Sequence, residues 1–199
     1  GLMMDPQSER QIQSIGIVVP FFNEEKVIRE FYKNLSAAIS SLPYQFFLYF
    51  IDDGSSDRTA ALLEEIARDD GRVTIIEFSR NFGHQAALSA GLDAARGDAV
   101  ISLDGDGQHP PELIPELIRL YVNNDEYDII QTKREPGNEP AVKRATSGFF
   151  YSLMNRFSNV KMIEGTADFR LMSRRSVDSL KRMPEYHRFL RGMIPWMGY

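Results

Sequence analysis

Cysteine is absent from the 199 residues of this chain. Its absence excludes disulfide bonds and thiolate metal sites, so any bound metal must be held by oxygen or histidine ligands. It also fits a reducing compartment. No apolar run approaches the roughly 20 residues that span a bilayer, and the first ten residues, "GLMMDPQSER", lack the apolar core of a secretory signal. The sequence therefore predicts a soluble domain.

With 43% hydrophobic residues, the chain can bury the core of one domain, predicted over 14–199 after a flexible N-terminus at 1–13. Its net charge of −5 is uneven. Residues 1–132 carry 10 Lys or Arg against 22 Asp or Glu, whereas residues 133–199 carry 13 against 6. The basic tail is either scattered, solvated charge or a surface that faces phosphate, on a ligand or on an anionic membrane. Nucleic-acid binding is not expected, because the body of the chain has no basic stripe.

Short β-branched runs alternate with amphipathic segments over the first 133 residues. Strands are predicted over 14–20, 46–53, 73–79, 98–104 and 127–133. Helices are predicted over 24–42, 55–71, 83–97 and 115–124. Because nearly continuous apolar strands that alternate with helices form parallel sheets covered on both faces, the predicted fold is α/β, a Rossmann-like, mainly parallel sheet with helices on both faces.

The alternation stops after residue 133. Two prolines and a glycine in 134–144 predict a mobile loop, and a helix is predicted over roughly 142–157. One more strand is predicted within 166–173. The last segment, 186–199, is both basic and apolar; it is either a buried core or interface helix or an amphipathic stretch lying in a membrane interface.

Polar residues gather directly after four of the predicted strands. They are Asn23, Glu24, Asp52, Asp53, Arg80, Asn81, Asp104 and Asp106. Each one alone is an ordinary turn or cap residue. However, ligands of open α/β sheets bind in the crevice at the carboxyl ends of the strands, so the eight together predict a binding site at one edge of the sheet.

Asp104 and Asp106 lie one residue apart in "ISLDGDGQHPPELIP". Two carboxylates this close repel each other unless they are protonated or bridged by a cation. Hard divalent ions such as Mg²⁺ and Mn²⁺ prefer oxygen ligands, and Mg²⁺ usually completes its shell with water and substrate phosphates. The pair therefore predicts a site for a divalent metal and a diphosphate.

Two other interpretations of the aspartate pair are weaker. An EF-hand loop that begins at Asp104 needs Gly at its sixth position and Glu at its twelfth, where His109 and Pro115 stand. A phosphatase of the haloacid dehalogenase type needs Thr or Val two residues after the second aspartate, where Gln108 stands. The first alternative fails, and the second would require phosphate release without a sugar acceptor.

Four segments occur in a characteristic order and spacing: "IVVPFFNEE", "FIDDGSSDRT", "FSRNFGHQAALSAGLDAARGD" and "LDGDGQHPPELIPELI". Together with "TADFRLMSRRSV" they resemble the family 2 glycosyltransferases of GT-A fold. Within that family the chain is most similar to the polyprenyl-phosphate glycosyltransferases, of the dolichol-phosphate mannose synthase and bactoprenol glucosyltransferase types. The resemblance implies an inverting, metal-dependent hexosyltransferase that moves one sugar from a nucleotide-sugar, such as UDP-glucose, to a polyprenyl phosphate.

The resemblance also implies roles for individual residues. The nucleotide would be bound by Pro20, Asn23, Glu24, Asp52, Asp53, Arg80 and Asp104. The metal, Mg²⁺ or Mn²⁺, would be held by Asp104, Asp106 and Gln108. Catalysis would depend on Asp168, Asp106 and Arg134. The acceptor and its phosphate would contact Lys143, Arg144, Arg170, Arg174 and Arg175. Asp53 would accept the imino N–H of the base, with Asp52 as the nearby alternative.

The nature of the acceptor decides what Asp168 must do. A sugar hydroxyl would need it as a general base, whereas a phosphate, with a second pKa of about 6, is already ionised at neutral pH and needs only to be oriented. The basic tail favours the lipid phosphate. A hydroxyl acceptor and a non-catalytic nucleotide-sugar binding module are the alternatives.

The resemblance further implies a membrane partner. Such enzymes continue into transmembrane helices, so the chain is expected to be a truncated catalytic domain that works at the cytoplasmic face of a membrane. Its C-terminal basic and aromatic segment would contact that surface, and a homo-oligomer is a further expectation.

Overall fold

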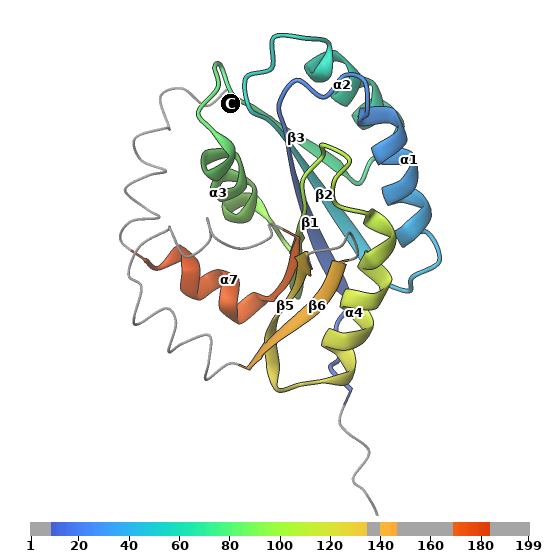
Figure 1. The fold of residues 1–199 in the computed structure, drawn as a ribbon, viewed down its shortest axis with the longest axis vertical. Coiled ribbons are helices and arrows are strands. Elements are labelled where there is room, and N and C mark those ends of the chain that lie inside the picture. Colours follow the sequence, from blue (N-terminus) through green and yellow to red (C-terminus); the bar gives the residue numbers. More distant parts are fainter. Residues whose placement is uncertain (1–8, 135–139, 147–168, 184–199) are drawn as a thin grey trace, which may run out of the picture.

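A computed structural model describes residues 9–134, 140–146 and 169–183 of the chain (Figure 1). For 133–134 and 140–146 only the backbone is described. Its strands are β1 (Ser14–Phe21), β2 (Gln45–Asp52), β3 (Val73–Glu77), β4 (Ala99–Ser102), β5 (Tyr127–Arg134), β6 (Pro140–Thr146) and β7 (Arg170–Ser173). Its helices are α1 (Ile28–Ile39), α2 (Thr59–Asp69), α3 (His84–Ala94), the 3₁₀ turn η1 (Pro111–Leu113), α4 (Ile114–Asn123) and α7 (Arg174–Lys181).

The strands form one seven-stranded sheet in the order β3-β2-β1-β4-β7-β5-β6. The first four strands of that order pair in parallel. β7 is antiparallel to both of its neighbours, β4 and β5, and β6 is antiparallel to β5. β1 to β5 therefore point one way, and only β6 and β7 oppose them. The predicted α/β, mainly parallel sheet is confirmed.

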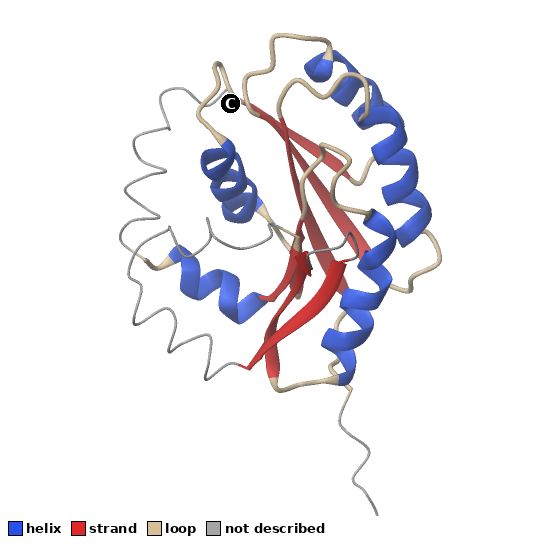
Figure 2. Ribbon diagram, viewed as in Figure 1, coloured by secondary structure: helices blue, strands red, loops and turns tan. Residues whose placement is uncertain are grey.

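Helices cover both faces of this sheet, as predicted (Figure 2). The α1, α2 and α4 helices pack on one face, where their apolar side chains meet Ile15, Ile17 and Val19 of β1. The α3 and α7 helices pack on the other face around Val18. Alternate β1 residues thus enter opposite cores because successive side chains of a strand point to opposite faces.

A glycine brings α3 close to the sheet. A Cβ atom at Gly91 would lie 2.3 Å from Cγ1 of Val18 and 2.7 Å from Cδ1 of Ile51, closer than real Cβ contacts allow. Only glycine permits this approach of helix to strands. The approach sets where the first residue of α3, His84, stands relative to the carboxyl ends of β1 and β4.

The segment after residue 133 differs from the prediction. The expected loop over 134–144 is wrong at Arg134, which ends β5, and at 140–144, and the start of the expected helix at 142 is wrong, because Pro140–Thr146 forms β6. Residues 135–139 of the expected loop lie outside the described residues. The register pairs Tyr127 with Thr146 and Arg134 with Pro140. The open edge of β5 supplies a hydrogen-bonding partner that local periodicity does not reveal. The rest of the predicted helix, 147–157, lies outside the described residues.

The strand predicted within 166–173 exists as β7, but its place in the sheet was not foreseen. It inserts between β4 and β5, so the fifth predicted strand does not neighbour the fourth. Residues 166–168 of that prediction and the segment 186–199 lie outside the described residues. Within the part of the chain that the structure describes, no helix has the length and apolar character needed to cross a bilayer.

Candidate functional site

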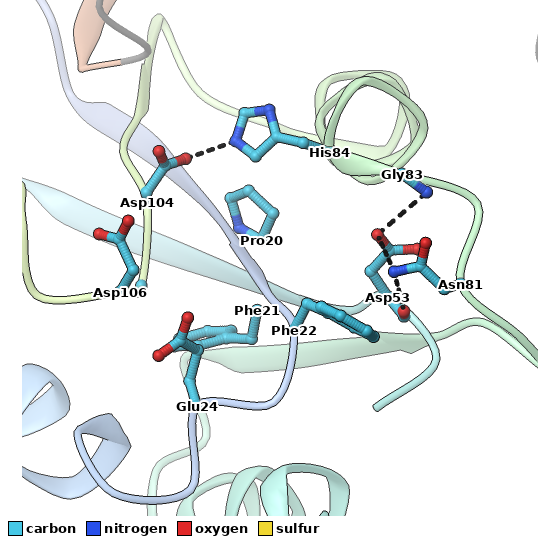
Figure 3. A pocket seen from close by; sticks show the side chains of 11 residues that line it. Pro20, Phe21, Phe22, Glu24, Asp53, Asn81, Gly83, His84, Asp104 and Asp106 are labelled. Atoms are coloured by element: carbon cyan, nitrogen blue, oxygen red, sulfur yellow. Dashed lines mark hydrogen bonds and ion pairs between the residues drawn. The ribbon is translucent and has the colours of Figure 1, made fainter. Parts of the chain in front are cut away.

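A pocket of about 320 Å³ opens at the carboxyl ends of β1, β2 and β4 (Figure 3). From β1 the chain proceeds to β2 and β3 on one side, whereas β4 pairs with the other side of β1. Such a reversal of strand order creates the crevice in which open α/β sheets bind ligands. The pocket is lined by Pro20, Phe21, Phe22, Glu24, Asp53, Asn81, Gly83, His84, Asp104, Gly105 and Asp106.

Asp53 joins the loop after β2 to the loop after β3. Its side chain is only 3% exposed. Oδ1 accepts a hydrogen bond from the backbone N–H of Phe82 (2.8 Å), and Oδ2 accepts from Gly83 N–H (3.1 Å) and from Asn81 Nδ2 (3.1 Å). Burial raises the pKa of Asp53, while these two backbone hydrogen bonds oppose the rise. Oδ1, with one donor, retains a lone pair that could accept from a ligand.

Asn23 and Asp52 hold the neighbouring loops and do not line the pocket. Asn23 has a left-handed backbone (φ 52°), which asparagine tolerates better than most residues, and its Oδ1 accepts from Ser56 N–H at 2.8 Å. Its own N–H donates to Ser55 Oγ at 3.0 Å. Asp52 is buried, and its Oδ1 accepts from Ser55 N–H at 3.0 Å. Asn23 therefore ties the loop after β1 to the loop after β2, and Asp52 closes a turn within the loop after β2.

The loop after β4 presents Asp104 and Asp106 to the pocket. Oδ1 of Asp104 lies 2.5 Å from Nε2 of His84. Oδ1 of Asp106 accepts from the backbone N–H of Gln108 at 2.9 Å. Gly105 between them is buried, and a Cβ there would lie 2.2 Å from Cε1 of Phe21. The glycine lets the loop rest on the Phe21 ring, so both carboxylates reach the same pocket.

Glu24 faces the two aspartates across the pocket (Figure 3). Its pKa is raised, first by burial and then by the negative charges of Asp106, Asp57 and Asp104. A carboxyl group whose pKa is raised by neighbouring negative charges marks a site where a cation would be stabilised. Glu24, Asp104 and Asp106 line the same pocket, so a cation bound there would relieve the repulsion that Glu24 experiences.

The donor set fits a hard divalent ion. Asp104 and Asp106 offer carboxylate oxygens, which Mg²⁺ and Mn²⁺ prefer. Among the described residues, no group of three or more His, Cys, Asp or Glu side chains is arranged as a complete metal site. Two carboxylates suit an ion that takes its other ligands from water and from a diphosphate. The two carboxylates therefore fit a metal ion that binds together with a diphosphate ligand.

The sequence profile of glycosyl transferase family 2 matches residues 16–181, which contain all of these pocket residues. The chain belongs to this family. It is 42% identical over 185 residues to the bactoprenol glucosyl transferase of Shigella phage SfV, covering 92% of this chain and 60% of that relative. It is 42% identical over 193 residues to the uncharacterized glycosyltransferase YkcC of Bacillus subtilis (strain 168), covering 96% and 58%. The chain thus spans less than two thirds of the length of these curated relatives.

Solved glycosyltransferases share the architecture. The mannosyltransferase PcManGT from Pyrobaculum calidifontis superposes with a TM-score of 0.59 at 18% identity, covering 89% of this chain and 49% of that one. S. aureus TarS 1-349 superposes with a TM-score of 0.60 at 17% identity, covering 94% and 56%. At these identities the likeness shows the fold, and this family 2 glycosyltransferase has the GT-A fold.

Two residues expected at the nucleotide and the metal lie beside the pocket. Arg80 is exposed, and its Cζ atom lies 4.7 Å from the centroid of the Phe82 ring. Gln108 is also exposed and contributes its backbone N–H to Asp106. Neither side chain belongs to the lining. Their assignment to ligands stays a prediction.

The basic residues of the β7–α7 junction contact other parts of the protein. Arg174 Nε donates to the carbonyl of Gly97 and its Nη2 to the carbonyl of Ala95, both at 2.9 Å. Arg175 donates to both carboxylate oxygens of Asp128, at 3.0 and 2.7 Å. These contacts close the end of α3 and fasten α7 to β5. A role for either arginine at an acceptor stays a prediction.

The remaining predicted residues are placed only in part. Arg170 is 7% exposed and pairs with Ser102 in the β4–β7 ladder. Arg134 ends β5, and Lys143 and Arg144 lie in β6, but their side chains lie outside the described part. Asp168 lies outside the described residues altogether. Of the predicted site residues, the structure therefore brings Pro20, Glu24, Asp53, Asp104 and Asp106 together in one pocket.

Phe22 and His84 are among the pocket residues that were not singled out from the sequence. Phe22, 45% exposed, stands at the mouth of the pocket, and His84 reaches Asp104 from the first position of α3. The sequence contained an indication that Phe22 and His84 lie near the predicted site. Phe22 adjoins the predicted strand end at Pro20, and His84 follows Asn81 by three residues in "SRNFGH". Their orientation toward the pocket required the structure.

Proposed function

We propose that this chain is the catalytic part of an inverting, metal-dependent glycosyltransferase that moves one sugar from a nucleoside diphosphate donor to a polyprenyl phosphate. The observation that carries the proposal is the convergence of Asp53, Glu24, Asp104 and Asp106 on one pocket at the reversal of strand order. The relatives named bactoprenol glucosyl transferase support glucose as the sugar and a lipid phosphate as the acceptor. UDP-glucose is therefore the first donor to test.

The nucleoside would occupy the side of the pocket formed by Phe22 and Asp53. An exposed aromatic ring at a pocket mouth can stack on a base. The remaining lone pair of Asp53 Oδ1 can accept the imino N–H of a uracil. The hydrogen bonds from Phe82 and Gly83 hold this carboxylate in place before a ligand arrives, so little ordering is needed on binding.

The diphosphate would lie on the opposite side, toward the loop after β4. Asp104 and Asp106 would hold the divalent ion there, and a bound ion neutralises charge that develops on the leaving diphosphate. A mannosyltransferase of the same fold was solved with GDP-mannose and Mn²⁺, which supports a divalent ion in this role. Gly105 lets the backbone approach the Phe21 ring, so the two carboxylates enter the pocket from a loop that packs on β1.

An acceptor phosphate would approach from the β5–β7 side. A phosphate oxygen would form the new bond to the anomeric carbon as the bond to the donor diphosphate breaks, with inversion at that carbon. Because a phosphate monoester is ionised at neutral pH, Asp168 would orient the acceptor rather than remove a proton. Arg134, Lys143, Arg144 and Arg170 would attract its negative charge.

Membrane association belongs to the same proposal. The C-terminal segment 184–199 lies outside the described residues, so its contact with a membrane surface rests on its basic and aromatic composition. We propose a location at the cytoplasmic face of the membrane, where a polyprenyl phosphate and a nucleotide-sugar can meet. A homo-oligomer stays an untested expectation.

The test is transfer of labelled glucose from UDP-glucose to a polyprenyl phosphate in detergent, with Mn²⁺ or with chelator. We expect a single-sugar lipid product that needs the metal and whose anomeric configuration is opposite to that of the donor. Transfer to a sugar hydroxyl instead would favour the alternative acceptor. Intact donor after prolonged incubation, together with tight UDP binding, would identify a binding module and contradict the proposal.

A further inference from the structure

His109 connects the loop that carries the aspartate pair to the start of β7. Its Nδ1 accepts a hydrogen bond from the backbone N–H of Asp104 at 2.9 Å. Its ring stacks on Phe169, with centroids 5.6 Å apart and planes at 29°. His109 does not line the pocket. It therefore acts from behind the site, on the backbone that presents Asp104.

The hydrogen bond defines one end of this connection. A ring nitrogen that accepts a hydrogen bond carries a lone pair, so the ring proton of neutral His109 resides on Nε2. The bond spans five residues and closes the loop after β4 on itself. The next residue, Gly105, is held from the other side because its N–H donates to the carbonyl of Pro20 at 3.3 Å. The backbone position of Asp104 is thus set by His109 and by β1 together.

The stacked ring defines the other end. Phe169 is 1% exposed. Its carbonyl accepts from both Thr132 N–H (3.0 Å) and Thr132 Oγ1 (3.1 Å). Thr132 is itself buried, at 4% exposure, in β5. Phe169 is therefore held in place by burial and by its hydrogen bonds to β5. It belongs to the antiparallel half of the sheet, whereas Asp104 belongs to the parallel half.

The position of Phe169 in the sequence suggests a function for the contact between His109 and Phe169. Phe169 directly follows Asp168, the residue that the family resemblance assigns to the acceptor side, and it directly precedes Arg170 of β7. The same imidazole thus touches the donor-side loop and the residue next to the acceptor-side segment. A residue that only fills the core would require only the ring contact with Phe169. A residue that only closes the loop after β4 would require only the hydrogen bond to Asp104. His109 makes both contacts.

We propose that His109 is a positioning residue that couples the aspartate pair to β7, so that binding of a metal–nucleotide complex at Asp104 and Asp106 is transmitted to Phe169. This inference rests on the proposed function, because the complex it transmits is the donor. His109 sets the distance between donor and acceptor sides and touches neither substrate.

Two variants separate the two contacts of the ring. His109→Phe keeps a planar ring on Phe169 but has no atom to accept the Asp104 N–H. His109→Asn keeps an acceptor near the position of Nδ1 but has no ring to stack. Phe169→Leu removes the stack from the other side and leaves His109 in place. Arg119→Ala, on the exposed face of α4, is the matched control.

The readouts are UDP affinity in Mn²⁺ by calorimetry and hydrogen exchange of the peptide that covers 169–173. In the unaltered chain and in the control, saturating Mn²⁺ and UDP should slow exchange of that peptide. His109→Phe should weaken UDP binding about tenfold, as loss of an outer-shell partner of a metal ligand does. His109→Asn and Phe169→Leu should bind UDP with nearly unchanged affinity, yet the 169–173 peptide should no longer respond.

Four outcomes would overturn the proposed coupling through His109. Slowed exchange of 169–173 in His109→Asn, equal to that of the unaltered chain, would overturn the coupling, and so would unchanged UDP affinity in His109→Phe. A purely structural role would speed exchange of the peptide before ligand is added and leave its response to ligand intact, which also overturns the inference. Absence of UDP and GDP binding in the unaltered chain would overturn the proposed function and this inference with it.

Discussion

At the carboxyl ends of β1, β2 and β4, carboxylates face a shared pocket, where burial and then the negative charges of Asp106 and Asp104 raise the pKa of Glu24. At the junction of β5, β7 and α7, the one buried carboxylate of the described residues there, Asp128, is paired with Arg175 and hydrogen-bonded by Ser173. Both regions contain buried or half-buried charge. Charge that the fold neutralises holds elements together, whereas charge left repelling in a pocket would be stabilised by a cationic ligand.

Removal of either member of the aspartate pair should have the largest effect. In Asp104→Asn and Asp106→Asn we expect Mn²⁺-dependent UDP affinity to fall at least about 100-fold, because direct ligands matter at least as much as outer-shell partners. In Asp106→Asn the free energy of unfolding should not fall, because a charge that repels Glu24 is removed. Calorimetry and urea unfolding measure the two quantities. Asp93→Asn, exposed on α3, is the control, and equal loss of affinity in that variant would contradict the assignment.

The opposite pattern is expected for Asp128→Asn. The variant should lose about 2 kcal/mol of unfolding free energy, the contribution of hydrogen bonds to a charged group, while UDP affinity stays unchanged. Burial would raise the pKa of Asp128, but Arg175 and Ser173 lower it below the ordinary 3.8. Its contribution is therefore present above that value and lost as the pH falls through the lowered pKa, so the deficit of the variant should shrink in acid. A deficit that persists unchanged in acid would count against the ion pair.

Gly105→Ala would disturb the pocket without changing any charge. Its added Cβ would meet the buried Phe21 ring at 2.2 Å, and overpacking of this kind costs about 1–3 kcal/mol. Thermal unfolding should show that loss, and UDP affinity in Mn²⁺ should fall because Asp104 and Asp106 move with the loop. Gly71→Ala is the control, since no atom lies within 4 Å of a Cβ at that position. Wild-type behaviour of Gly105→Ala would show that the loop has room to shift.

Glu24→Gln should give the smallest change in stability. Because its folded pKa is raised above the ordinary 4.5, Glu24 favours folding below that value, and this contribution is lost as the pH rises through the raised pKa. The variant should therefore match the unaltered chain near pH 4 and be more stable at neutral pH, by at most about 0.5 kcal/mol for a partly exposed group. Urea unfolding at the two pH values measures this, and a variant less stable at neutral pH would contradict the electrostatic account.

Much of the parallel half of the sheet, with its pocket, could be predicted from the sequence. The strands that precede Asn23, Asp52 and Asp104 are continuous apolar runs, and polar residues at their ends must meet at one edge of a parallel sheet. The antiparallel half was harder. β6 was predicted as loop and helix because a seven-residue strand at the edge of β5 depends on its partner, which local periodicity does not show.

Individual roles within the motifs depended on contacts between distant residues. Asp52 and Asp53 are adjacent and equally acidic, yet Asp53 lines the pocket while Asp52 closes a turn at Ser55. From the sequence, Arg174 and Arg175 of the basic tail are predicted to contact the acceptor and its phosphate. In the structure, Arg175 pairs with Asp128, 47 residues earlier in the chain. No local pattern identifies such a partner.

Period and residue type are local properties, so the alternation of strands and helices over the first 133 residues and the edge at which the polar residues gather could be predicted before the chain was folded. Only the folded chain shows which carboxylates face the pocket, which arginines are paired within the protein, and that β7 lies between β4 and β5. Those outcomes arise from side chains that meet only after the chain has folded. His109 shows both: its place beside the aspartate pair is visible in the sequence, and its contact with Phe169, 60 residues later, exists only in the fold.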